Sequence, residues 1–108
     1  MYTNRPACTV WEKGVQDRAA VYTRHVFGAV YWEDTRGESA DSVTREPEDK
    51  ILCIAHTSSV TYMPKPDDKI MDGEINDLTP PRTALTVTAV KDFRYGTPDV
   101  QHIEVTAK

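Results

Sequence analysis

The last third of the chain constrains the fold more than any other part, because apolar and polar side chains alternate along it. A period of two places successive side chains on opposite faces of a β-sheet. Residues 92–99, between the two alternating runs, contain Gly, Pro and Asp, which are typical of turns. The sequence therefore predicts a long β-hairpin, with one arm over Leu85–Val90 and the other over His102–Ala107.

Four further segments predict strands, and no segment predicts a helix. The segment Lys13–Asp17, centred on Gly14, is expected to be a turn. A continuously apolar run flanked by polar residues is typical of a central strand covered on both faces. The chain is therefore expected to be all-β, a small antiparallel barrel or sandwich of about six strands. The four further strands are expected at Ala7–Glu12, Arg18–Glu33, Ile51–His56 (the central one) and Lys69–Ile75, where Gly73 permits a turn.

The segment Arg18–Glu33 is too long for a straight strand in a small domain. Gly28 in its middle predicts a bulge or a bend. Because the end of the strand is apolar on both faces, it is expected to curve around a small barrel or to meet a partner chain. Strict alternation places Tyr22, Val26, Val30 and Trp32 on one face, and Phe27, Ala29 and Tyr31 on the other.

Residues 34–50 are expected to form a long polar loop. The segment contains one Val and one Ala among polar and charged residues, so it cannot hold a place in a core. It is also longer than a hairpin connection needs. We expect it to be solvated or to depend on a partner.

The size and charge of the chain limit the classes of protein to which it can belong. A chain of 108 residues is expected to form a single β-barrel domain, 1–108, with a small core, because only 39% of its residues are hydrophobic. Marginal stability alone is therefore plausible, and burial against neighbours would help. The net charge of −4 argues against a protein that grips nucleic-acid phosphates, but it suits a wall that DNA passes without adhering. No run of about 18 apolar residues is present, so no membrane partner is expected.

Residues with catalytic or metal-binding chemistry are few and scattered. Cys8 and Cys53 are expected to be buried thiols in a reducing cytosol, although a disulfide between them stays open. The three histidines do not have metal-ligand spacing. His56 with Ser58 or Ser59 is only part of a nucleophilic set. We therefore expect no enzymatic activity, no metal and no cofactor.

The aromatic residues have two interpretations. They could form a stacking surface for single-stranded nucleic acid, as on a small five-stranded barrel. Alternatively, they are core and interface side chains, which the lack of interleaved basic residues favours. The residues concerned are Trp11, Tyr22, Phe27, Tyr31, Trp32, Phe93 and Tyr95.

Seven short motifs are spread over most of the chain: Cys8–Trp11, His25–Glu33, Pro66–Ile70, Gly73–Ile75, Leu85–Asp92, Tyr95–Pro98 and His102–Val105. Together they resemble a family of small tailed-phage virion proteins, encoded among head–tail connector and minor capsid genes. The closest similarity is at the end of the chain, where the family has a similar strand, a Tyr-Gly-Ser-Pro-like turn and a His-x-Glu-Val-like final strand. The family's Pro-Gly-Asp is Pro-Asp-Asp here.

The resemblance implies a virion structural protein, similar in layout to head-closure (stopper) proteins. Such proteins are small β-barrels that assemble in the host cytoplasm into a ring of six or twelve copies. The ring stands at the head–tail junction, between a portal or adaptor protein and a tail-terminator or tail-tube protein. It retains double-stranded DNA and passes it without specific binding. A long loop faces the channel.

Two groups of residues are expected to carry this function. The loop is expected to face the channel or a partner, and aromatic residues near strand ends are expected to make contacts between subunits. Alternatives that stay open are a tail-completion or minor tail or capsid protein, and a small barrel, OB-like, that binds nucleic acid or a peptide. The loop residues are Thr35, Arg36, Glu38, Asp41, Arg45, Glu46, Glu48 and Asp49; the contact residues are Tyr31, Trp32, Phe93 and Tyr95.

Overall fold

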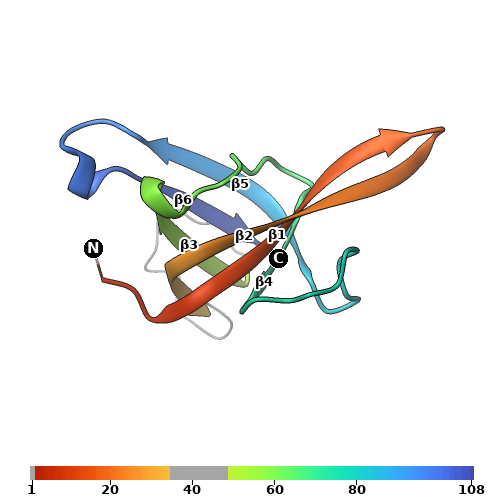
Figure 1. The fold of residues 1–108 in the computed structure, drawn as a ribbon, viewed down its shortest axis with the longest axis horizontal. Helices are drawn as coiled ribbons and strands as arrows, with labels where there is room; N and C mark the ends of the chain where they lie inside the picture. The colour runs from red at the N-terminus through yellow and green to blue at the C-terminus, as the bar shows by residue number, and fades with distance from the viewer. Residues whose placement is uncertain (1, 35–48) are drawn as a thin grey trace.

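The computed structural model describes residues 2–34 and 49–108. Its six strands close into a barrel in the order β1-β2-β3-β6-β5-β4, and all neighbouring strands are antiparallel (Figure 1). The expected all-β antiparallel barrel is therefore confirmed. The elements are β1 (Arg5–Gln16), β2 (Ala19–Asp34), β3 (Ile51–His56), the 3₁₀ turn η1 (Thr57–Ser59), β4 (Lys69–Asp72), β5 (Leu85–Phe93), the 3₁₀ turn η2 (Pro98–Val100) and β6 (His102–Ala107).

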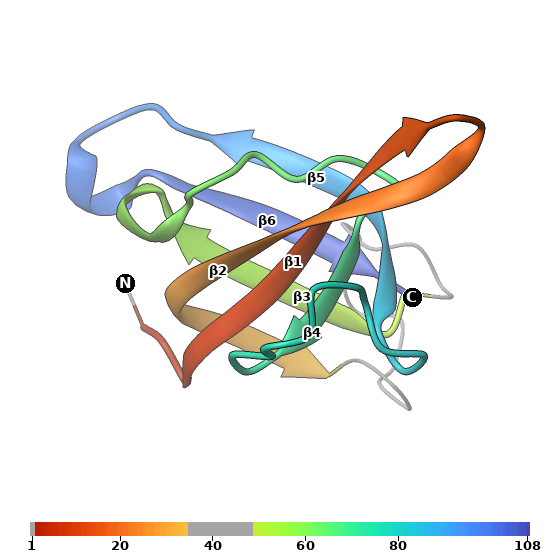
Figure 2. The same cartoon turned by 45° about the vertical axis from the view of Figure 1, so that its right-hand side comes forward.

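The core draws on every strand of the barrel. Figure 2 shows the strands that enclose it from a second side. The predicted terminal hairpin is present, and the alternation in its second arm is confirmed, because Ile103, Val105 and Ala107 have no exposed surface. In the first arm a register shift between Val87 and Ala89 interrupts the alternation. A β-bulge of this kind bends a strand and so helps a short sheet to close.

The strand β3 is central, as predicted, because it pairs with β2 on one side and β6 on the other. Ile51, Cys53 and Ala55 point into the core. The expectation that both of its faces are covered is only partly met, since Leu52 and Ile54 are half-buried. The second face of this strand therefore keeps some contact with solvent.

The turn between β1 and β2 lies later than predicted. The expected turn at Lys13–Asp17 is wrong, because β1 continues to Gln16 and pairs there with Ala19. The connection consists of Asp17 and Arg18, with φ angles of +52° and +67°. Two left-handed residues in a two-residue loop match the right-handed twist of the flanking strands. The result is a longer hairpin, which extends beyond the barrel in Figure 1.

The strand β2 bends beside Gly28, as predicted, but the bend changes which side chains face inward. Ala29 has a φ angle of +38°, and both Gly28 and Ala29 are exposed. Phe27 and Val30 are therefore both core residues, although strict alternation had placed them on opposite faces. The bend directs the end of β2 around the barrel toward β3.

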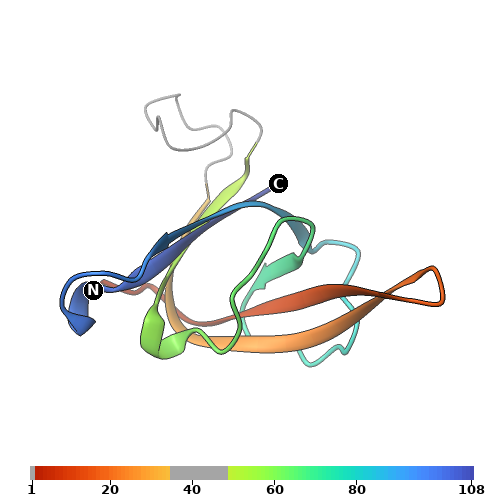
Figure 3. The same ribbon diagram turned by 90° about the horizontal axis from the view of Figure 1, so that it is seen from above.

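A second layer covers the outer face of β1. Trp11 lies on the opposite face of β1 from Cys8 and Val10, yet it has no exposed surface. Its Nε1 donates to the carbonyl oxygen of Asp77 at 2.9 Å, and Thr9 Oγ1 donates to the carbonyl oxygen of Gly73 at 2.7 Å. The β4–β5 connection therefore packs on the outside of the barrel, beside β1 and β2 (Figure 3).

Candidate functional surfaces

Most of the predicted loop lies outside the described residues. Of its eight predicted residues, Asp49 alone lies in the part of the chain that the structure describes. The expectation that its side chain faces a channel or a partner is corrected, because the side chain is buried. Asp49 is 6% exposed, and Thr88 Oγ1 donates to its Oδ1 at 2.9 Å. The same hydroxyl lies 3.1 Å from Thr106 Oγ1. Asp49 therefore joins the loop end to β5 and β6 and does not face a channel. The other seven are Thr35, Arg36, Glu38, Asp41, Arg45, Glu46 and Glu48.

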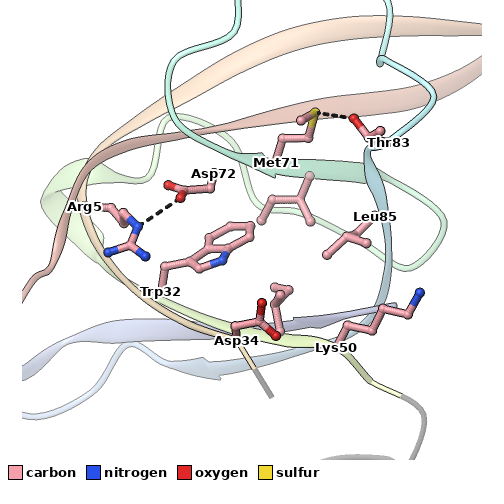
Figure 4. A pocket seen from close by; sticks show the side chains of 10 residues that line it. Arg5, Trp32, Asp34, Lys50, Met71, Asp72, Thr83 and Leu85 are labelled. Carbon is pink, nitrogen blue, oxygen red and sulfur yellow. Dashed lines mark hydrogen bonds and ion pairs between the residues drawn. The ribbon is translucent and has the colours of Figure 1, made fainter. Parts of the chain in front are cut away.

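A pocket of about 300 Å³ opens at the end of the barrel where β2 ends and β3 begins (Figure 4). Apolar side chains form much of its wall, and the ion pair between Arg5 Nε and Asp72 Oδ2, 2.9 Å apart, lies on its rim. No Ser, Cys or His is among the described residues that line it. The pocket combines an apolar wall with the charged side chains of Asp34, Lys50 and Asp72. Its lining includes Trp32, Asp34, Lys50, Ile70, Met71 and Leu85.

Of the first pair of predicted contact residues, only Tyr31 has a partly exposed side chain. Trp32 is 8% exposed and packs in the core of its own barrel, so it is not the exposed anchor that was expected, and the surface that it offers to a partner is in the wall of the pocket. Its backbone is held in place by Asn4, whose Oδ1 accepts from Trp32 N at 2.7 Å. Tyr31 is half-buried, and its ring lies 5.8 Å from that of Tyr2. Because β2 alternates, the two neighbours point to opposite faces.

The second pair lies together on the β5–β6 connection. The rings of Phe93 and Tyr95 are 6.1 Å apart, and Phe93 also stacks on His102 at 4.9 Å. Tyr95 is 68% exposed and Val100 is 54% exposed. We call Phe93, Tyr95, Val100 and His102 the aromatic patch. Aromatic side chains that are held by neighbours and still reach solvent are typical of protein interfaces.

The connection that carries the aromatic patch has contacts of its own. Gly96 has a φ angle of +85°, which favours glycine, and a Cβ at this position would lie 3.3 Å from the Val100 side chain. Gln101 Nε2 donates to the carbonyl oxygen of Gly96 at 3.0 Å. A glycine is therefore needed at position 96 for this turn to place Val100 beside Tyr95.

The projecting part of the β1–β2 hairpin, residues 13–22, is a surface that the sequence analysis missed. We call it the arm. Val15 and Val21 are 74% and 41% exposed, respectively. All residues from Val15 to Val21 are exposed, so the tip of the arm has solvent on both faces. Apolar Val15 and polar Gln16, after Gly14, continue the strand β1. Because a turn was expected at Gly14, these two residues were not predicted to be part of a strand.

A polar network holds the base of the arm to the β3–β4 connection. Asp68 is fully buried, and its carboxylate accepts hydrogen bonds from the backbone N–H of Lys13 at 2.9 Å and from the Tyr62 hydroxyl at 2.7 Å. It also accepts from the backbone N–H and the Nζ of Lys65, both at 3.0 Å. His25 stacks on Tyr62 with 4.3 Å between ring centroids. The network is a structural joint, because each oxygen of Asp68 has donors from the chain itself.

The electrostatics of this network favour the charged form of Asp68. Burial alone would raise its pKa, but the hydrogen bonds from Lys13, Tyr62 and Lys65 outweigh burial and hold the pKa below 3.8. Burial and the hydrogen bond to Asp68 raise the pKa of Tyr62 to about 12. Of the paired acids at 67 and 68, Asp68 therefore serves the fold. Within the described residues, no three His, Cys, Asp or Glu side chains come together as metal ligands would.

His56 and Ser58, considered above as part of a nucleophilic set, do lie together. His56 Nδ1 is 2.8 Å from Ser58 Oγ and also accepts from the backbone N–H of Ser58 at 3.1 Å. The other ring nitrogen, Nε2, lies 2.7 Å from the carbonyl oxygen of Pro98. Accepting at Nδ1 leaves the proton on Nε2, where it is donated to Pro98. In this arrangement the histidine caps η1 and ties it to η2.

The two cysteines are buried free thiols, as predicted. Their Sγ atoms are 3.9 Å apart inside the barrel. The hydrogen bond with Cys8, together with burial, raises the pKa of Cys53 well above its ordinary value. The thiolate, which is the reactive form, is therefore disfavoured.

The aromatic residues considered for a stacking surface do not share one face. Trp11 and Phe27 have no exposed surface, and Trp32 is 8% exposed. They also lie in two places, because Trp11 is outside the barrel and the other two are inside. Their distribution is typical of core residues. Within residues 2–34 and 49–108, no helix has the length and apolar character needed to cross a membrane.

Comparison with known proteins identifies the family of this chain, but the function of that family is unknown. The chain belongs to a family of unknown function, DUF6751, whose match covers residues 3–108. No curated protein and no solved structure matches the chain.

Proposed function

We propose that the protein is a non-enzymatic structural subunit of a tailed-phage virion, which forms a ring at the head–tail junction. In this role it joins the portal or adaptor protein to the tail, and it retains and passes double-stranded DNA. The resemblance of its motifs to head–tail connector proteins gives the proposal its class. The geometry gives it a means of assembly.

The arm is the observation that carries the proposal. Six large apolar side chains are well exposed among the described residues, and four of them belong to the arm or to the aromatic patch. Exposed apolar side chains gathered on projecting segments mark sites of protein–protein contact. The four are Val15, Val21, Tyr95 and Val100.

The interior supports a structural role as well. The fully buried carboxylate of Asp68 has four donors, and Trp11 Nε1 has an acceptor at 2.9 Å. These groups join loops to the barrel, and their hydrogen-bonding positions are already used within the chain. The pocket in Figure 4 has an apolar wall with charges on its rim, as a site for a neighbour's side chain would.

The charge of the chain fits passage of DNA. With a net charge of −4, the surface repels phosphates overall and provides no strong non-specific grip. A ring through which a genome must move benefits from this property. The proposal therefore includes DNA as a passing partner and not as a bound ligand.

Particles purified from an infected culture test the function. Mass spectrometry of intact virions should find the protein as a stoichiometric component. Particles from a phage with the gene deleted should have filled heads that lose their DNA and no tails attached. A matched phage that carries the wild-type gene in trans should recover. Absence of the protein from purified particles, with normal infectivity after deletion, would contradict the proposal.

A further inference from the structure

We propose that the arm of one copy binds the aromatic patch of the next copy, so that the chain assembles head to tail through two different surfaces. The inference rests on the proposed function in one respect, which is that the chain assembles with itself. It names the two surfaces that meet and the residues that carry the contact. A copy with a substitution in one of the two surfaces should still associate through the other.

The positions of the two surfaces lead to this arrangement. The longest dimension of the molecule is 40 Å. In Figure 1, where the longest axis is horizontal, the arm projects at one end and the β5–β6 connection lies at the other, and Figure 3 shows the same separation. A surface at one end cannot reach the other end of its own chain. Contact between two different patches on successive copies gives a ring when the rotation between copies closes.

The side chains that meet are apolar on both surfaces. Val15 and Val21 lie on opposite faces of the two-stranded ribbon, because Val15 pairs with Ala20 and Val21 pairs with Gly14, and Val15 is the more exposed of the two. We therefore assign the contact to the face of the arm that carries Val15. The patch presents the larger and flatter side chains of Tyr95 and Phe93, with Val100 beside them. Contact between valine and aromatic rings removes apolar surface from water on both partners.

Charges at the two ends also match. Arg18 stands at the turn of the arm, and Asp99 stands on the connection that carries the patch. Both side chains are exposed, and among the described residues neither forms an ion pair. A hydrogen bond from Thr97 lowers the pKa of Asp99, which keeps that carboxylate ionised at neutral pH. Asp17, the other residue of the turn, is also exposed and carries the opposite charge, so the contact is favoured in the orientation that brings Arg18, and not Asp17, to Asp99.

The other exposed apolar residues provide a control. Leu78 is 77% exposed and belongs to neither surface, because it lies on the β4–β5 connection, next to the Asp77 carbonyl that accepts from Trp11. An aspartate there adds the same charge to an equally exposed apolar position. If assembly depended on exposed apolar surface in general, Leu78→Asp would weaken it as much as a change in the arm.

The test is a mixing experiment followed by sedimentation velocity, with the full chain in every sample. The wild type and Leu78→Asp should form oligomers. The arm variant Val15→Asp and the patch variant Tyr95→Asp should each sediment as monomers, with association weakened at least about 30-fold, as expected of residues at the centre of an interface. Far-UV circular dichroism should show that both variants keep the wild-type fold, because both positions are exposed.

The mixture of the two variants separates this arrangement from others. Val15→Asp keeps an intact patch and Tyr95→Asp keeps an intact arm, so an equimolar mixture should form a dimer with one copy of each and nothing larger. The inference is overturned if the mixture stays monomeric, if Val15→Asp assembles like the wild type, or if the wild type stays monomeric up to about 1 mM.

These outcomes are distinct from those for the proposed function. Assembly through the arm and the patch, in a protein that is absent from purified particles, would leave this inference standing and remove the virion role. A protein that is present in particles, and whose Val15→Asp variant still assembles, would do the reverse.

Discussion

The base and the tip of the β1–β2 hairpin use opposite chemistry. At the base, the backbone of Lys13 donates to a carboxylate that has no exposed surface and four donors in all. At the tip, two residues further along, Val15 is 74% exposed. Polar groups are thus buried and bonded in one region, while apolar groups are left in solvent in the other. The base therefore stabilises the monomer, whereas the tip is the part that we propose for assembly.

The largest effect is expected at the base. Asp68→Asn replaces an oxygen that accepts hydrogen bonds by an amide nitrogen that cannot, inside a buried site. We expect a loss of about 2–4 kcal/mol in the free energy of unfolding, measured by chemical denaturation. The same change one position earlier, Asp67→Asn, is the control. Asp67 is exposed with a φ angle of +79°, a conformation that asparagine tolerates well, so stability should hardly change. Equal effects of the two changes would contradict the role of the network.

The second prediction concerns acid. The pKa of Asp68 in the folded protein is lower than 3.8, its ordinary value, so its charged form stabilises the fold at all pH values above about 4. This contribution should be lost as the pH falls through the folded pKa. The free energies of unfolding of the wild type and Asp68→Asn should therefore converge as the pH falls below about 4. A difference between the two proteins that stays constant across this range would show that the network does not depend on the charge.

The third prediction concerns the turn at the tip. Arg18 has a φ angle of +67°, which costs a residue with a side chain about 1 kcal/mol. Arg18→Gly should therefore raise the free energy of unfolding by about 1 kcal/mol, while Arg18→Ala, which keeps the Cβ, should not. Both variants lose the charge proposed to face Asp99, so both should associate more weakly. A gain of stability in Arg18→Ala would point to the charge, and not the backbone, as the source of strain.

The smallest change in stability is expected from one substitution made in the arm and compared with the same substitution in the core. Val15→Thr keeps the shape of the side chain in solvent, so the free energy of unfolding should change by less than about 0.5 kcal/mol, while association weakens. Val10 lies on the same strand with no exposed surface. Val10→Thr buries a hydroxyl and should cost about 1–3 kcal/mol. If Val15→Thr destabilised the monomer as much as Val10→Thr, the division between base and tip would be lost.

The fold could be predicted from the sequence because alternation is a local signal. His102–Ala107 carries it clearly and Leu85–Phe93 carries it up to the register shift between Val87 and Ala89, and the two segments form the predicted hairpin. Gly28 predicted the bend in β2, because an isolated glycine in a strand marks such a position. The exchange of faces at Phe27 could not be predicted, since it depends on the conformation that Ala29 adopts once the barrel closes.

The surfaces could be predicted only in part. Phe93 and Tyr95 were named because aromatic residues tend to anchor interfaces, and the structure places their rings 6.1 Å apart; their contact with another copy stays a prediction. The arm was missed because Asp17-Arg18 is not a usual pair for a left-handed two-residue turn, whereas Gly14 resembles one. Asp49 and Trp32 were misplaced because burial there results from long-range contacts, with Thr88 for the first and with the core for the second. Sequence spacing gives no sign of either contact.

Cross-linking between the arm and the patch tests the central claim most directly. The native thiols of Cys8 and Cys53 have no exposed surface, so only introduced cysteines will react with a short bis-maleimide. The doubly substituted chain, Val15→Cys with Tyr95→Cys, should give a ladder of dimers, trimers and larger species, while each single variant gives none. A double variant that stays monomeric after cross-linking, or a Val15→Cys variant that forms dimers alone, would contradict head-to-tail assembly through these two surfaces.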